Sequence, residues 1–271
     1  MTDCYKQIPI TYARGLFDDF VDVTYVITMK NSPRRTQLLR QLNKFKPTSL
    51  VVILENKGYK ECAKQVCNKP INKGSLDVAH ANRYIASLTR TRKNVLILED
   101  DVEFSDELLR DPRHVSRMGQ FILANPNFGA YSLGSVNILM MYNPFSSHQK
   151  LWLKGGVHAV IYNKQNRDTF ENSACDNTLE SNDIDAYTQV TAGNSPWSYY
   201  RVLAGQVFTA TENSKNWGMG LNLFQPVAYW FTRDDAVGGM ENMNMVFFII
   251  NMIIYAAGAK LILRIYKTAR K

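Results

Sequence analysis

The first hundred residues contain short apolar runs separated by polar stretches with helical spacing. Val23–Met29, Leu50–Leu54 and Val95–Leu98 are rich in aliphatic and β-branched residues, which is typical of strands buried on both faces of a sheet. Between these runs, the patterns of Pro33–Phe45 and Leu76–Thr89 predict helices. Strands that alternate with helices indicate a parallel sheet with right-handed crossovers.

The pattern becomes less regular after about residue 110. No repeat or linker interrupts residues 1–235, so we expect them to form one domain. The further elements that the pattern predicts are helices over 113–124, 164–172 and 183–190, a strand over 129–133, and strand over 151–162 with a turn at Gly155–Gly156.

Residues 243–271 stand apart from this domain. Met245–Ala259 is almost wholly apolar and is broken by Asn251. As a helix this run is about 22 Å long, short of a hydrocarbon core of about 30 Å. Basic residues recur at helical spacing towards the end of the chain. The pattern fits a helix that lies on an anionic membrane surface or a short tail anchor, and a buried terminal helix is the alternative.

Composition narrows the choice of partner. The chain has 271 residues with 45% hydrophobic and 21% charged positions, as in ordinary globular proteins, and a net charge of +8. No basic stripe interleaved with aromatic residues is present, so we do not expect a nucleic-acid partner. A nucleotide diphosphate or an anionic lipid headgroup fits the charge better.

The cysteines do not form a recognisable motif. Cys4, Cys62, Cys67 and Cys175 lack zinc-site spacing, and four are too few for a disulfide framework in a chain of this length. The N-terminal stretch lacks the apolar core of a signal peptide, and no Asn-x-Ser/Thr acceptor occurs. We therefore expect reduced thiols and a cytoplasmic protein, peripheral or tail-anchored at a membrane through residues 243–271.

Three adjacent carboxylates, Glu99, Asp100 and Asp101, directly follow the third predicted strand. Ligands of open α/β sheets bind at this end of the strands. In extended backbone Glu99 and Asp101 point to one side and Asp100 to the other. Two carboxylates on one side suit Mn²⁺ or Mg²⁺, which also bind diphosphate oxygens and neutralise a leaving group during sugar transfer. The alternative is a solvated turn in which Asp100 or Ser105 caps the next helix.

Several blocks, in order, resemble glycosyltransferase family 25, the lipopolysaccharide and collagen galactosyltransferase-like group. Ala79 stands where that family usually has Ser. The blocks are Tyr25–Arg35, Gly74–His80, Leu96–Val102, Tyr131–Gly134, His158–Tyr162, Ile184–Tyr187 and Tyr200–Gln206. The resemblance implies an α/β fold of the GT-A type: a single domain with a mostly parallel central sheet flanked by helices, here followed by the C-terminal hydrophobic helix.

The resemblance also implies a function. It indicates a metal-dependent transferase that moves a sugar, with inversion, from a UDP-linked donor to a hydroxyl of a glycan or lipid-linked acceptor. Glu99 and Asp101 would hold Mn²⁺ or Mg²⁺, with His158 as a third ligand or a phosphate contact. A satisfied core histidine is the alternative for His158.

Further residues are candidates for binding the nucleotide. Arg34 and Arg35 follow the first strand, where they can reach phosphates or the base, although both also suit a solvated helix start. Glu55 ends the second strand and can accept a hydrogen bond from the base. His80 is either a nucleotide contact or a packed helix residue. Thr28 and Asp100 complete this set.

An inverting transfer needs a carboxylate that takes the proton of the acceptor hydroxyl. Asp185 fits the family segment better, and Asp183, the second candidate, also suits the N-cap of the following helix. Trp197, Tyr199 and Tyr200 either stack on an acceptor sugar or belong to the core.

Two other functions compete with glycosyl transfer. A nucleotidyltransferase uses the same metal and diphosphate, but the loop after the first strand lacks the glycines of a phosphate loop. A non-catalytic sugar-binding or membrane-adaptor protein is the second alternative, and the intact acidic triplet argues against it.

Overall fold

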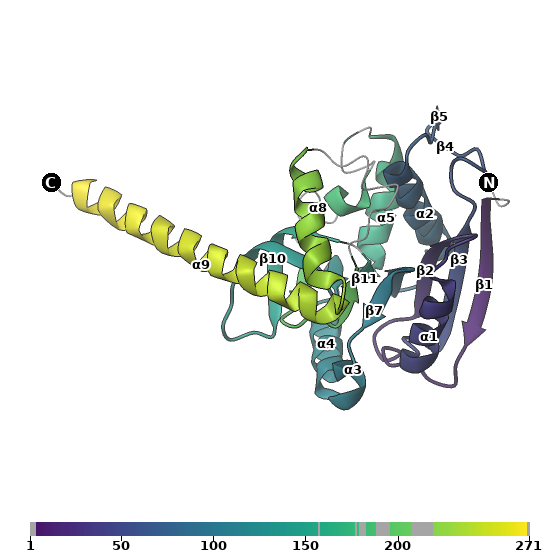
Figure 1. Cartoon of the computed structure of the whole chain (residues 1–271), viewed down its shortest axis with the longest axis horizontal. Coiled ribbons are helices and arrows are strands. Elements are labelled where there is room, and N and C mark those ends of the chain that lie inside the picture. Colours follow the sequence, from purple (N-terminus) through teal and green to yellow (C-terminus); the bar gives the residue numbers. More distant parts are fainter. Residues whose placement is uncertain are drawn as a thin grey trace.

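A nine-stranded sheet runs through the part of the chain that the computed structural model describes, namely residues 4–156, 158–176, 178, 183–187, 196–207 and 219–269 (Figure 1). From one edge to the other the strands are β1 (Tyr5–Thr11), β3 (Leu50–Asn56), β2 (Val23–Met29), β6 (Asn94–Glu99), β11 (Ala159–Asn163), β8 (Ala130–Ser132), β12 (Trp197–Tyr199), β10 (His148–Gly155) and β9 (Val136–Met141).

The sheet is mixed, so the expectation of a mostly parallel sheet is wrong. Strand β2 is parallel to β3 and β6, as the sequence pattern predicted, and β8 is parallel to β12. The five remaining neighbouring pairs are antiparallel. The direction changes between β6 and β11, which are antiparallel neighbours.

Helices cover both faces of the parallel strands, which explains why these strands are continuously apolar. One core contains Leu38 and Phe45 of α1, and the other contains Ile85 of α2 and Phe170 of α5. The helices are α1 (Arg35–Phe45), α2 (Gly74–Leu88), α3 (Glu107–Arg110), α4 (Arg113–Ala124), α5 (Lys164–Asn172), the 3₁₀ turn η2 (Ser173–Cys175), α7 (Ile184–Tyr187), α8 (Met219–Thr232) and α9 (Ala236–Ala269). Residues 188–190 of the helix predicted over 183–190 lie outside the described part of the chain.

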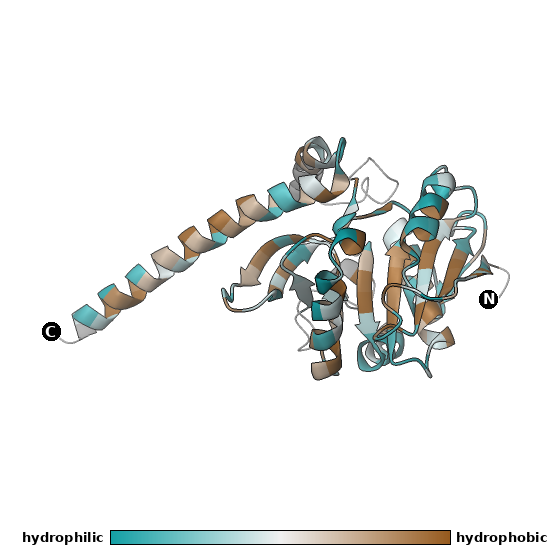
Figure 2. Ribbon diagram, turned by 90° about the horizontal axis from the view of Figure 1, so that it is seen from below, coloured by the Kyte–Doolittle hydropathy of each residue, from teal (hydrophilic) through white to brown (hydrophobic). Residues whose placement is uncertain are grey.

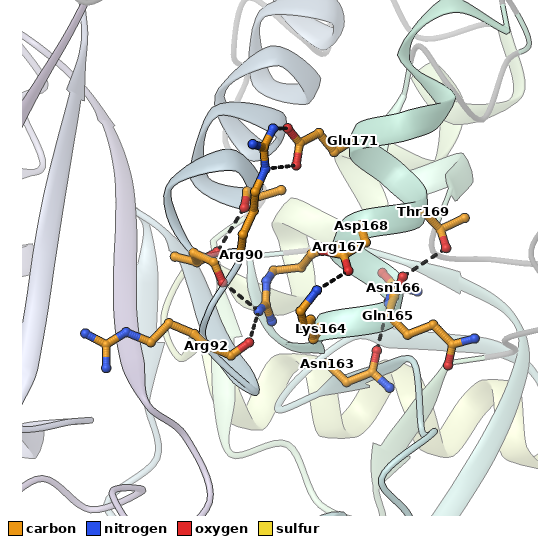
Figure 3. Close-up of polar contacts among 12 residues, drawn as sticks. Arg90, Arg92, Asn163, Lys164, Gln165, Asn166, Arg167, Asp168, Thr169 and Glu171 are labelled. Carbon is orange, nitrogen blue, oxygen red and sulfur yellow. Dashed lines mark hydrogen bonds and ion pairs between the residues drawn. The ribbon is translucent and has the colours of Figure 1, made fainter.

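Arg167 of α5 connects this helix to the turn that follows α2 and to the end of β11. Its guanidinium donates hydrogen bonds to the carbonyl oxygens of Tyr162 at 2.7 Å, Arg92 at 2.6 Å and Thr89 at 3.2 Å (Figure 3). Two of these carbonyls belong to the turn that follows α2. Burial lowers the pKa of Arg167 to about 10, which leaves it charged at neutral pH. This cluster is therefore structural.

The cysteines are paired, so the expectation of reduced thiols is wrong. Disulfides join Cys4 to Cys62 and Cys67 to Cys175. The partners are 58 and 108 residues apart in sequence, which is why spacing did not reveal them. Both bonds hold the segment between β3 and α2, which also contains the short strands β4 (Gln65–Val66) and β5 (Lys69–Pro70). Reduced thiols were one argument for a cytoplasmic protein, and the disulfides remove that argument.

The first turns of α9 pack on the part of the chain that contains the sheet, called the body. Gly205 lies so close to this helix that an added Cβ would sit 2.6 Å from the carbonyl carbon of Ala236. Met240 and Met243 are buried. The helix thus begins before residue 243, and its first turns belong to the same body as the sheet.

Side chains of α9 also cover the free edge of β9. Asn244 accepts a hydrogen bond from the Asn137 amide at 2.7 Å, and Asn251 donates one to the Ile138 carbonyl at 2.9 Å. Tyr255 donates to the Met140 carbonyl. Asn251, which interrupts the apolar run in the sequence, therefore satisfies backbone groups that an edge strand would expose.

The remainder of α9 extends away from the body (Figures 1 and 2). Residues 256–268 are exposed, among them Leu261, Ile262 and Leu263. Ala236–Thr268 is long and apolar enough to cross a membrane; its most apolar 18-residue stretch has a mean hydropathy of 2.1 and is only 6% buried. The predicted C-terminal hydrophobic helix is therefore present.

The disulfides make a testable contribution to stability. We expect the Cys67→Ala/Cys175→Ala protein to lose about 2–4 kcal/mol of the free energy of unfolding, because the cross-link restricts the unfolded chain. Denaturant titrations with and without a reductant measure this. The reductant should lower the stability of the wild type below that of the variant, because it also opens Cys4–Cys62. A wild type that is insensitive to the reductant and as stable as the variant would contradict the pairing.

Candidate functional site

The acidic triplet lies where three parallel strands end. Glu99 is the last residue of β6, and Asp100 and Asp101 form the turn before β7 (Val102–Phe104). Because β2, β3 and β6 run in one direction, Thr28 of β2 and Glu55 of β3 come to the same edge. The register confirms this, because Thr28 pairs with Glu55 and Ile27 with Glu99.

Asp100 is held from two sides. The Thr28 hydroxyl donates a hydrogen bond of 2.7 Å to its Oδ2 atom. Arg34 Nη1 lies 3.3 Å from Asp100 Oδ1 and 3.3 Å from Asp101 Oδ2, so one guanidinium spans both carboxylates. Beside this group, Arg35 forms an ion pair with Glu55. Two arginines and three carboxylates are thus paired at the carboxyl edge of the sheet.

The orientation of the triplet differs from the expected alternation. We predicted that Asp100 points away from Asp101, yet Arg34 contacts both. The prediction assumed extended backbone, whereas β6 ends at Glu99 and the chain turns at Asp100–Asp101. Within the described residues, no group of three or more His, Cys, Asp or Glu side chains is arranged to hold a metal ion. The expected Glu99–Asp101–His158 set is therefore not assembled.

Asp101 is the most unusual member of the site. Gln206 Nε2 donates a 2.8 Å hydrogen bond to Asp101 Oδ2. Oδ1 is buried and has no hydrogen-bond partner among the described residues. Burial is the main cause that raises the pKa of Asp101, while Gln206 and Arg34 act in the opposite direction. A buried carboxylate oxygen without a partner is costly, and such groups often mark functional sites.

His158 lies on the other side of Gln206. The ring is fully buried, and Nε2 is 3.0 Å from the Ala204 carbonyl oxygen, which can only accept, so Nε2 carries the proton. Nδ1 then keeps a lone pair, and it has no partner within hydrogen-bonding geometry in the described residues. Burial is the main cause that lowers the pKa of His158 to about 4, so the ring is neutral at neutral pH. It therefore offers a phosphate no positive charge.

Gln206 donates to Asp101 and lies beside His158, and the sequence reasoning did not name it as a site residue. It ends β13 (Ala204–Gln206), which pairs with β7 directly after the acidic turn. Gly156, at a φ of +85°, makes room for the His158 ring, because an added Cβ would lie 3.2 Å from His158 Nδ1. The only sequence signal was its position at the end of the Tyr200–Gln206 block.

His80 packs against β1. Its Nδ1 atom shares a 2.7 Å hydrogen bond with the Tyr5 hydroxyl, and the two rings are stacked. Burial is the main cause that lowers its pKa to about 4. Nearby, Asp77 of the same helix pairs with the buried Lys64. These contacts account for His80 as a packed residue of α2.

The two candidate bases lie on a different element. Asp183 precedes α7, and its carbonyl accepts from the Tyr187 amide at 2.9 Å. Asp185 is within α7, but its side chain lies outside the described residues. The contacts of α7 are with α2 and with α5, where the Tyr187 hydroxyl donates to the Asn166 carbonyl at 2.9 Å.

The three aromatic candidates, Trp197, Tyr199 and Tyr200, differ in how far they are buried. Tyr199 is in the core, with its hydroxyl 3.0 Å from His114 Nδ1, and the Trp197 ring packs on Phe121. Tyr200 is 49% exposed and is the one of the three that lines a cavity.

Comparison with known proteins does not assign the chain to a family. No protein-family model matches the sequence, and no curated protein is significantly similar to it. Among solved structures, the crystal structure of A197 from STIV is similar to this chain at 12% sequence identity and a TM-score of 0.37. The match covers 70% of this chain and 86% of that chain. A likeness at this level carries no functional conclusion.

The raised pKa of Asp101 predicts an unusual pH dependence. The folded protein holds this proton more tightly than the unfolded chain, so ionisation lowers stability as the pH rises from 3.8 through the raised pKa. We expect Asp101→Asn to stabilise the protein at pH 7 by on the order of 1 kcal/mol. The difference should disappear below pH 3.8.

Asp106→Asn is the matched control. The hydrogen bond from Lys44 is the main cause that lowers the pKa of this exposed carboxyl, so its loss should weaken the protein at pH 7. Thermal melts of both variants across this pH range test the account. Destabilisation by Asp101→Asn at pH 7 would show that Asp101 serves the fold and is not a strained site residue.

Proposed function

We propose that the chain is a glycosyltransferase that uses a nucleotide-sugar donor, as the family resemblance implies. The observation that carries the proposal is the cluster at the carboxyl edge of β2, β3 and β6, where Arg34 and Arg35 lie beside Asp100, Asp101 and Glu55. Arginine is the side chain best suited to bind a diphosphate at two points. Thr28 and Glu55 then offer hydrogen bonds to the nucleoside.

The Asp101 carboxylate is suited to bind a divalent metal ion that arrives with the nucleotide sugar. Its unpartnered Oδ1 is a hard anionic ligand, and Mg²⁺ and Mn²⁺ commonly use one or two carboxylates together with phosphate oxygens and water. In this arrangement Asp101 and Asp100 would hold the ion, and it would supply positive charge to the departing diphosphate. A complete protein cage of three ligands is unnecessary.

The protein side chains then have distinct tasks. Arg34 exchanges its carboxylate partners for phosphate oxygens, while Gln206 keeps Asp101 oriented. The acceptor oxygen forms a bond to the anomeric carbon as the bond from that carbon to the diphosphate oxygen breaks. Asp185, or Asp183, takes the proton of the acceptor hydroxyl, and the anomeric configuration inverts.

Nucleotidyl transfer is the rival that shares the metal and the diphosphate. The Met29–Arg34 loop contains no glycine, and Arg34 occupies the N-cap position of α1 without a side-chain cap. This turn therefore presents arginine side chains and lacks a glycine-rich cradle of amide groups. A charged edge of this kind favours the proposed transferase.

The donor site makes a direct binding prediction. We expect UDP to bind the full chain in the presence of Mn²⁺, with affinity lowered at least about tenfold by Asp101→Ala or by a chelator, because a charge-assisted ligand is lost. Isothermal titration calorimetry measures this, with the surface change Asp106→Ala as control. UDP affinity that is the same in all four conditions would contradict the proposed metal–diphosphate site.

We further propose that α9 attaches the enzyme to a membrane. The support is its exposed apolar surface: beyond Tyr255 its large side chains are exposed on every side of the helix, including Leu261, Ile262 and Ile265. Exposed apolar surface of this extent belongs in lipid or against a partner, and this part of α9 contacts no core in the described chain. Lys260, Arg264 and Lys267 can then meet anionic headgroups.

Membrane attachment is tested by Ile262→Asn/Leu263→Asn. Both side chains are more than half exposed, so thermal stability should be unchanged. Affinity for anionic vesicles should fall on the order of a hundredfold, because two apolar side chains no longer enter the lipid. Vesicle co-sedimentation gives the measurement. Equal binding by the wild type and the variant would contradict insertion of this segment.

A further inference from the structure

A cavity of about 370 Å³ opens where α9 leaves the body. Its walls come from β9, β10, the segment after β12 and the second to fourth turns of α9. It lies close to the candidate site along α9, because Met240 contacts the Gln206 amide and the next residue, Glu241, lines the cavity. A volume of this size lies within the range of small-molecule sites.

Two opposite charges line this cavity without a partner among the described residues. Arg201 comes from the loop after β12 and Glu241 from α9. Neither forms an ion pair or a side-chain hydrogen bond with the described chain, whereas the Gln149 and Asn244 side chains in the same wall are fully engaged. A simple anion would satisfy Arg201 and be repelled by Glu241. A ligand that carries both a negative and a positive group satisfies both.

The remaining walls indicate an amphiphile. The rings of Tyr142, Tyr200 and Phe248 line the cavity, and aromatic faces attract ammonium groups. Met245, also in the wall, is 60% exposed and continues into the apolar surface of α9. A headgroup in the cavity could thus leave its acyl chains along the helix that we place in the membrane.

We propose that this cavity binds the headgroup of a zwitterionic phospholipid with a primary ammonium, the phosphate on Arg201 and the ammonium on Glu241. This inference rests on the proposed membrane attachment of α9 and is independent of the transferase activity. The site would fix the orientation of the body above the bilayer, with the carboxyl edge of the sheet at a constant height. A quaternary ammonium has no N–H to donate to Glu241 and should bind more weakly.

The test compares vesicles that differ only in headgroup. The full chain is co-sedimented with phosphatidylcholine vesicles containing a fixed share of phosphatidylglycerol, with and without phosphatidylethanolamine. We expect phosphatidylethanolamine to increase affinity on the order of tenfold, the effect of one charge-assisted hydrogen bond. Arg201→Gln and Glu241→Gln should each abolish the increase, and soluble phosphoethanolamine should compete only weakly, because it lacks acyl chains.

Arg264→Gln is the matched control, since it removes the same charge from an exposed position of α9 outside the cavity. It should weaken binding to all anionic vesicles and leave the phosphatidylethanolamine increment intact. If the wild type shows no increment, or if Arg201→Gln keeps it, the headgroup site is wrong even though α9 binds lipid. If the full chain binds no vesicle, the membrane attachment fails as well.

Discussion

The common direction of β3, β2 and β6 is the constraint on which the rest of the structure depends. Their carboxyl ends meet at one edge, and this alone brings Thr28, Glu55 and the acidic turn together from segments up to 73 positions apart. The buried aliphatic faces of these strands hold the edge in place from both sides. The polar groups at the edge are therefore positioned by packing, so the fold tolerates a carboxylate such as Asp101 whose own environment opposes its charge.

The parts of this arrangement that were predictable are those with local signals. Continuous β-branched runs identified β2, β3 and β6, and their alternation with α1 and α2 predicted the parallel pairing. The convergence of Arg34, Arg35, Glu55 and Asp100 followed from that pairing. The second half of the sheet was not predictable in this way, because antiparallel neighbours such as β6 and β11 lie far apart in sequence and leave no local trace of their direction.

Long-range contacts account for the remaining errors. The disulfide partners are brought together by the fold across 108 positions, so spacing could not pair Cys67 with Cys175. Gln206 acts on Asp101 across 105 positions through the pairing of β13 with β7. Asn251 looked like an interruption in a membrane helix, whereas its amide closes the edge of β9. Each of these residues has a role that depends on a partner strand and not on its own neighbours.

Helix α9 has two halves in different surroundings. Asn244, Asn251 and Tyr255 fasten the first half of α9 to β9, and the second half carries its apolar surface away from the body. If α9 enters a membrane as proposed, these bonds would limit the rotation of the body about that attachment.

The central claim is that the charged edge transfers a sugar from a nucleotide donor. A screen of nucleotide sugars, with release of the free nucleotide measured in Mn²⁺, in Mg²⁺ and in chelator, tests it most directly. The account predicts metal-dependent release of UDP from at least one UDP-sugar by the wild type and none by Asp101→Ala. Release that survives in chelator, or that is equal in the variant, would contradict it.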